Sequence, residues 1–106
     1  MNTPRVFVVQ FDARKDFSQA EQFGTLVYVF TDRIRNNYAH AVQMAMKVLE
    51  DFHPQDYLLP IGEPLANCIC MESVMSVLDE PVVNMLRYNS MHDYYEDVKL
   101  DFNSGE

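Results

Sequence analysis

Residues 56–78, DYLLPIGEPLANCICMESVMSVL, decide the fold of this chain. The apolar run at 57–61 is typical of a buried strand, and the proline inside it predicts that the ladder of hydrogen bonds ends there. Gly62 then turns the chain, and Glu63 stands where it can cap a helix that starts with a proline. That helix, residues 64–78, is apolar nearly all round, so we expect it in the centre of the domain.

Four more strands and a short helix follow from the patterns on either side. β-Branched, aromatic or alternating runs predict strands at residues 5–11, 25–31, 82–88 and 94–102. The run at 25–31 is almost continuously apolar, which predicts burial on both faces of the sheet. Ser18 and Glu21 have the spacing of a capping box, and Gly24 is a typical helix stop. We therefore expect a short helix over 19–23.

A long helix is expected between the second and third strands. Thr31 or Asp32 can cap its start, and apolar residues recur at three- and four-residue steps as far as Phe52. Because strands alternate with helices, the order predicts a three-layer α/β sandwich, with a mostly parallel sheet and an antiparallel C-terminal hairpin. The length indicates a single domain, 1–106, with 103–106 as a flexible tail. Whether the first two strands are parallel stays open.

The charge of the chain is strongly acidic and unevenly distributed. The net charge is −8; residues 1–53 carry six basic and six acidic side chains, and residues 54–106 carry two basic and ten acidic ones. Such a surface repels the phosphates of nucleic acids and anionic lipids, so neither is an expected partner. No apolar run is long enough to span a membrane. A protein with a basic surface is the better partner, although acidity alone also keeps small proteins soluble.

The residue types that usually carry catalysis or bind metals are sparse. Cys68 and Cys70 point about 200° apart on a helix, so they cannot bridge each other, and both are expected to be small buried apolar residues. None of the three histidines stands at a metal-binding spacing, and no Gly-rich phosphate loop is present. We therefore expect no metal, no cofactor and no conventional catalytic site.

Several segments in their order along the chain resemble a known group of proteins. These are DFSQAEQFG with the following LVYVF, the central DYLLPIGEP, and the closing MLRYNSMHDYYEDVKLDF. They resemble a group of small tailed-phage proteins of uncharacterised function that share a Tyr-Leu-Leu-x-x-Gly-Asp/Glu-Pro motif. Glu63 stands where that group usually has Asp, and Tyr88-Asn89 stands where it usually has Trp-Asp. The resemblance implies a phage-encoded protein that acts in the cytoplasm of a bacterial host, and it implies no particular activity.

The turns after the strands are one candidate site. In α/β sheets these turns hold ligands, which places a predicted pocket at Asp12, Asp32, Gly62 and Glu63. If the three carboxylates converged around Mg²⁺, the protein would be a small nucleotide- or magnesium-binding enzyme. However, Glu63 and the following proline disfavour an anion at this helix start. Glu63 is then only a helix cap, and the turn is chosen for its geometry.

The acidic C-terminal hairpin is the other candidate site. Alternation on its last strand puts Tyr95, Asp97 and Asp101 on one face, together with Asp93, and we expect that face to be exposed. Aromatic side chains with flanking charge suit a protein interface, so the partner-binding residues are expected to be Tyr88, Asp93, Tyr95, Asp97 and Asp101. The simpler alternative is a solvated edge strand that its charges keep from aggregating.

The sequence therefore favours a small non-enzymatic phage protein that binds a host or viral protein through its acidic C-terminal half. It would act as an inhibitor, or as a nucleic-acid mimic in a basic groove. Mimicry is the weaker form, because acids four residues apart on a strand repeat at roughly 13 Å, more sparsely than the phosphates of DNA.

Overall fold

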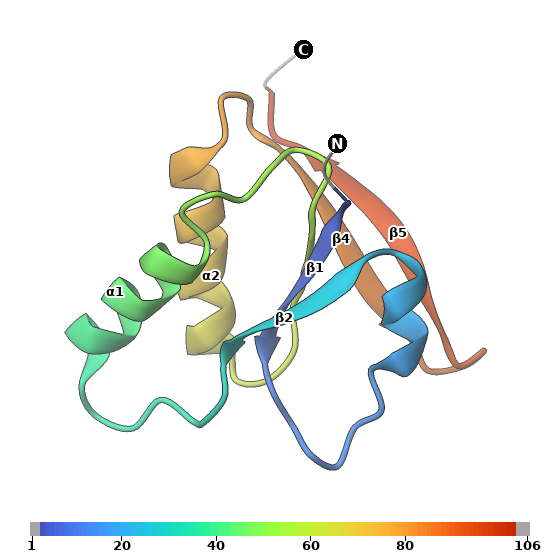
Figure 1. Ribbon diagram of the computed structural model, residues 1–106, viewed down its shortest axis with the longest axis horizontal. Coiled ribbons are helices and arrows are strands. Elements are labelled where there is room, and N and C mark those ends of the chain that lie inside the picture. Colours follow the sequence, from blue (N-terminus) through green and yellow to red (C-terminus); the bar gives the residue numbers. More distant parts are fainter. Residues whose placement is uncertain (1–2, 104–106) are drawn as a thin grey trace.

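The computed structural model describes residues 3–103, which form one five-stranded sheet in the order β2-β1-β3-β4-β5 (Figure 1). The strands are β1 Arg5–Gln10, β2 Thr25–Phe30, β3 Tyr57–Leu59, β4 Val82–Asn89 and β5 Tyr94–Asp101. Strands β1 to β4 run parallel, and β5 returns antiparallel to β4. The predicted α/β class and C-terminal hairpin are confirmed, and the first two strands prove to be parallel. Most of the expected tail lies outside the described residues.

Right-handed crossovers explain where the helices lie. The chain steps one way along the sheet from β1 to β2, and the other way from β2 to β3 and from β3 to β4. A right-handed connection therefore puts the 3-10 helix η1, Ser18–Gln22, on one face. It puts α1, Tyr38–Val48, and α2, Pro64–Val77, together on the other face. Figure 1 shows α1 and α2 side by side, with the short helix on the far side of the sheet.

Each face of the sheet has its own core. Under α1 and α2, side chains from the sheet such as Phe7, Val9 and Leu58 pack on Ala45 and Cys70. Under η1 lies a smaller core, made of Val6, Val8, Phe17, Ala20, Leu59, Leu86 and Tyr95. Strand β1 supplies both cores from alternate residues, which is why residues 6–9 are apolar without interruption.

The long helix starts later than expected. Neither Thr31 nor Asp32 caps it; the cap is Asn37, whose side-chain oxygen accepts a hydrogen bond from the backbone N–H of His40 at 3.1 Å. Residues 31–37 form a loop instead. All three residue types are good helix caps, so the local sequence alone does not select among them. The expected long helix is therefore confirmed in type, but it starts later than predicted and ends at Val48, about one turn before Phe52.

Two further details differ from the sequence-based expectations. The backbone N–H of Ser18 donates to Asp16 at 2.9 Å and the Ser18 side chain caps nothing, so the predicted capping box is absent. Strand β2 is an edge strand, and only its last two residues are buried, so the expected burial on both faces is wrong for its first four residues. An edge strand has neighbours on one side only, which leaves its side chains half open.

The two cysteines differ in their exposure to solvent. Cys70 is buried against the sheet, and this burial raises the pKa of its thiol to about 12. Cys68 is exposed, so the expectation that both thiols are buried is wrong for Cys68. Helix α2 packs on the sheet and on α1 along one side only, and the residue two positions before Cys70 points to the open side.

Candidate functional site

The strand order reverses between β1 and β3, and a cavity lies at that point. β1 leads outward to β2, whereas β3 leads to β4 on the opposite side. In open α/β sheets a crevice forms beyond the carboxyl ends of two such strands. Here the loops that follow β1, β2 and β3 line a cavity of about 470 Å³. The structure thus brings together the four residues predicted for a pocket: Asp12, Asp32, Gly62 and Glu63.

The start of α2 is held by a residue that the sequence did not single out. The side-chain oxygen of buried Gln10, at the end of β1, accepts a hydrogen bond from the backbone N–H of Glu63 at 3.3 Å. Gly62 has φ +95°, and a Cβ there would lie 2.3 Å from that same oxygen of Gln10. Gly62 is therefore required for both its backbone angle and this close approach. Because Gln10 accepts from the amide of Glu63, just before the helix, that amide cannot hold an anion.

The charged groups of this cavity do not form a metal site. Asp12 bonds Arg14 through the guanidinium, at 3.1 Å, and through the backbone N–H, at 3.0 Å. The side-chain hydrogen bond from Arg14, reinforced by the backbone one, lowers the pKa of Asp12. Among residues 3–103, no three His, Cys, Asp or Glu side chains are placed to hold a metal ion. The convergence of Asp12, Asp32 and Glu63 that a magnesium enzyme needs is therefore not formed.

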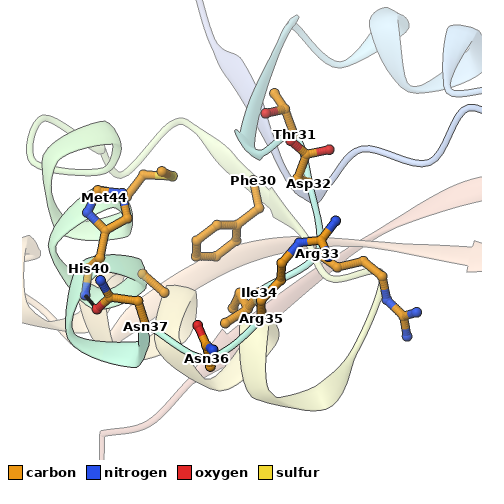
Figure 2. A pocket seen from close by; sticks show the side chains of 11 residues that line it. Phe30, Thr31, Asp32, Arg33, Ile34, Arg35, Asn36, Asn37, His40 and Met44 are labelled. Carbon is orange, nitrogen blue, oxygen red and sulfur yellow. Dashed lines mark hydrogen bonds between the residues drawn. The ribbon is translucent and has the colours of Figure 1, made fainter.

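A second cavity, of about 310 Å³, lies between the loop 31–37 and the start of α1. Figure 2 shows the ring of Phe30 in its centre, with His40 and Met44 on the helix side and Ile34 on the loop side. This cavity was not predicted, because the sequence pattern favoured a helix where the loop runs. The two asparagines before Tyr38 were the available signal, since Asn favours turns and helix caps.

The tip of the β4–β5 hairpin is ordered by its own polar side chains. Asn89 accepts a hydrogen bond from the backbone N–H of His92 at 3.2 Å, and Asp93 has a positive φ of 57°. The hydroxyl of Tyr88 donates a hydrogen bond to the carboxylate of Asp93, which raises the pKa of Tyr88. The ring of Tyr88 also packs on that of Tyr95, 5.3 Å between centroids. The turn therefore has a defined shape before any partner arrives.

We call the exposed residues around this tip the hairpin surface. It has two sides, because Tyr88 pairs with Tyr95 and lies on the face of Asp97 and Asp101, whereas Tyr94 lies on the opposite face. Its three large apolar side chains, Tyr88, Met91 and Tyr94, are 45%, 84% and 40% exposed. The exposed acids of the surface are Asp93 at the tip, followed by Asp97 and Asp101 along β5. Two of the three apolar residues, Met91 and Tyr94, were not among the residues predicted for partner binding. Met91 does stand out in the sequence, as a flexible apolar residue in a polar turn that could lie at a surface.

Tyr95 is a correction to the predicted partner-binding set. It is 7% exposed and packs in the core under η1, and this burial raises the pKa of its hydroxyl. Alternation correctly put Tyr95 on the same face as Asp97 and Asp101. However, η1 covers that face only at the tip, so Tyr95 is buried while the two aspartates beyond it are exposed.

The comparisons with known proteins identify a family. The family model of the phage Pam3 gp32-like protein matches residues 4–102, nearly the whole chain. No curated protein and no solved structure matches significantly. Within residues 3–103 there is no helix with the length and apolarity to cross a membrane. The expected phage resemblance is thus confirmed at the level of the family, and the chain belongs to the phage Pam3 gp32-like protein family.

Proposed function

We propose that this phage protein binds another protein, of the host or of the phage, through the hairpin surface. The observation that carries the proposal is the exposure of Met91 at the ordered tip and of Tyr88 and Tyr94 on its two faces, with exposed acids on the face of Tyr88. Single exposed apolar residues are ordinary, but a group of them next to a charged strip is typical of an interface. The proposed site of action is the cytoplasm of the bacterial host.

In the proposed mechanism, charge speeds the encounter and apolar contact stabilises the complex. Asp93, Asp97 and Asp101 attract a basic surface and speed the encounter. Burial of Met91 and the aromatic rings then holds the complex, because such side chains dominate binding energy at interface centres. The hydrogen bond from Tyr88 to Asp93 fixes the ring in advance, so less side-chain freedom is lost on binding. This arrangement supports a protein partner better than mimicry of DNA, because the apolar groups have no counterpart on a phosphate backbone.

The test is capture of partners from lysates of host cells with and without phage infection. The bait is the whole chain, compared with the variant Asp93→Lys/Asp97→Lys/Asp101→Lys. A matched control reverses three exposed acids at the far end of the sheet from the hairpin tip, Glu72→Lys/Asp79→Lys/Glu80→Lys, which changes the net charge by the same amount. We expect a partner that the control captures and the hairpin variant loses, with capture weakening as salt rises.

Met91→Ala separates the apolar contact from the charge. It should reduce capture of the same partner without changing its salt dependence, because no charge is lost. The proposal is wrong if the hairpin variant captures the partner as well as the control does, or if no partner is captured from either lysate.

A further inference from the structure

Strand β2 leaves one edge of the sheet open and unprotected. It pairs with β1 on one side, and within residues 3–103 no strand lies on its other side. Its six residues, TLVYVF, include no charged residue and no proline. The opposite edge is different, since β5 carries Asp97, Lys99 and Asp101 on its exposed positions. Natural proteins place such charges on free edges to prevent pairing with other strands. An apolar edge without charges therefore indicates an edge that pairs with another strand.

The backbone of β2 shows which groups are free to pair. The N–H of Thr25 donates to the carbonyl of Pro4 at 3.2 Å, so the backbone N–H and C=O groups of Thr25 point toward β1. Because the direction of these backbone groups alternates along a strand, those of Val27 and Val29 also point toward β1. The N–H and C=O groups of Leu26 and Tyr28 therefore point outward, away from the sheet.

We propose that the outer edge of β2 pairs antiparallel with β2 of a second copy of this chain, joining two five-stranded sheets across a two-fold axis. Residues whose backbone groups point outward must form hydrogen bonds with residues of the same kind. Leu26 of one copy therefore lies opposite Tyr28 of the other. Val27 then lies on the axis, opposite its own symmetry mate. This register forms about four new backbone hydrogen bonds, in two pairs.

A second copy fits this edge better than a strand of another protein, for two reasons. The half-buried side chains of Leu26, Val27 and Tyr28 lie on both faces of the strand, and a symmetry-related strand would cover them with equally apolar side chains. An open hollow of about 730 Å³, lined by Glu21 and Thr25 among others, gives room beside the start of β2 for the loop that follows Phe30 of the other copy.

Disulfide cross-linking tests the pairing directly. In a Cys68→Ser background, Val27→Cys places two thiols on the axis, where paired strands bring Cα atoms about 4.5 Å apart, within reach of a disulfide. Under mild oxidation we expect a covalent dimer that reduction reverses. Lys99→Cys, on the guarded edge, is the matched control and should cross-link at least about tenfold less, because its geometry is not set by pairing. A dimer in Tyr28→Cys but not in Val27→Cys overturns the proposed register.

The mass of the intact protein in solution is the second test. Sedimentation should give about twice the 12.4 kDa of one chain. Thr25→Lys changes an exposed residue, so the monomer should fold normally while the added charge at the joined edges weakens the dimer by at least about tenfold. The proposal is overturned if the protein keeps the mass of one chain at every concentration and Val27→Cys cross-links no better than Lys99→Cys. A dimer that Thr25→Lys leaves intact and Val27→Cys does not trap overturns it as well.

Discussion

Asp56→Ala should lower the free energy of unfolding by about 4 kcal/mol, because Asp56 ties three parts of the chain together. Its carboxylate is 1% exposed. It accepts hydrogen bonds from the backbone N–H of Arg5, the backbone N–H of His53 and the guanidinium of Arg5, all at 2.9 Å. These contacts join the start of β1 and the segment after α1 to the start of β3.

The magnitude follows from what the substitution leaves behind. Two backbone N–H groups lose their partner, and each costs about 1–3 kcal/mol when it is left unsatisfied. The guanidinium of Arg5 adds little, because its side chain is 28% exposed and also bonds Asp51. Asp56→Asn keeps one side-chain oxygen, which can still accept from the backbone of Arg5. It loses the oxygen that serves His53 and the guanidinium. About half the loss, roughly 2 kcal/mol, is therefore expected for Asp56→Asn.

Urea unfolding followed by far-ultraviolet circular dichroism measures these values. For a protein of this size a loss of 4 kcal/mol should move the unfolding midpoint by about 2–3 M urea. Asp51→Ala is the control, since the Asp51 side chain is 66% exposed and its ion pair with Arg5 is worth no more than about 1 kcal/mol. If Asp56→Ala costs less than about 1 kcal/mol, or no more than Asp51→Ala, the carboxylate does not hold these segments together.

Two further predictions follow from the packing. Gly62→Ala should lower the free energy of unfolding by about 2–4 kcal/mol in the same urea assay, because φ is +95° and the new Cβ would meet Gln10; a loss below about 0.5 kcal/mol would contradict this. At pH 8, iodoacetamide should modify Cys68 and spare Cys70 until urea unfolds the protein, as mass spectrometry can show, because burial raises the Cys70 pKa to about 12; equal labelling of both thiols in the native protein would contradict this.

The sequence predicts the strands and their alternation with helices well, because each strand has a simple pattern of apolar residues. Residues 6–9 of β1 are apolar without interruption and buried on both faces, whereas β5 alternates and has one open face. Start points of helices are harder. Thr31, Asp32 and Asn37 are all suitable caps, and the structure uses Asn37. Which residue starts the helix depends on how the chain packs after β2, and the local sequence does not determine this packing.

The candidate sites show the same limit. Asp12, Asp32, Gly62 and Glu63 were predicted to share a pocket because each follows a strand, and parallel strands end at the same edge. Gln10 was not found, because a polar residue at the end of a strand looks like an ordinary exposed one. The burial of Tyr95 was also hidden, since alternation tells which residues share a face but not how far a short helix covers that face.

The two proposed surfaces lie on opposite edges of the sheet, so one molecule can use both at once. β2 and β5 lie on opposite sides of the sheet (Figure 1). Three strands separate them, so about 19 Å lies between the two edge strands at about 4.8 Å per strand. A dimer joined through β2 would carry a hairpin surface at each far end. It would therefore bind a partner with repeated sites more tightly than a monomer does. Thr25→Lys should then weaken capture of such a partner without touching the hairpin surface, whereas Met91→Ala should weaken capture and leave the dimer intact. The two variants thus test the two surfaces separately.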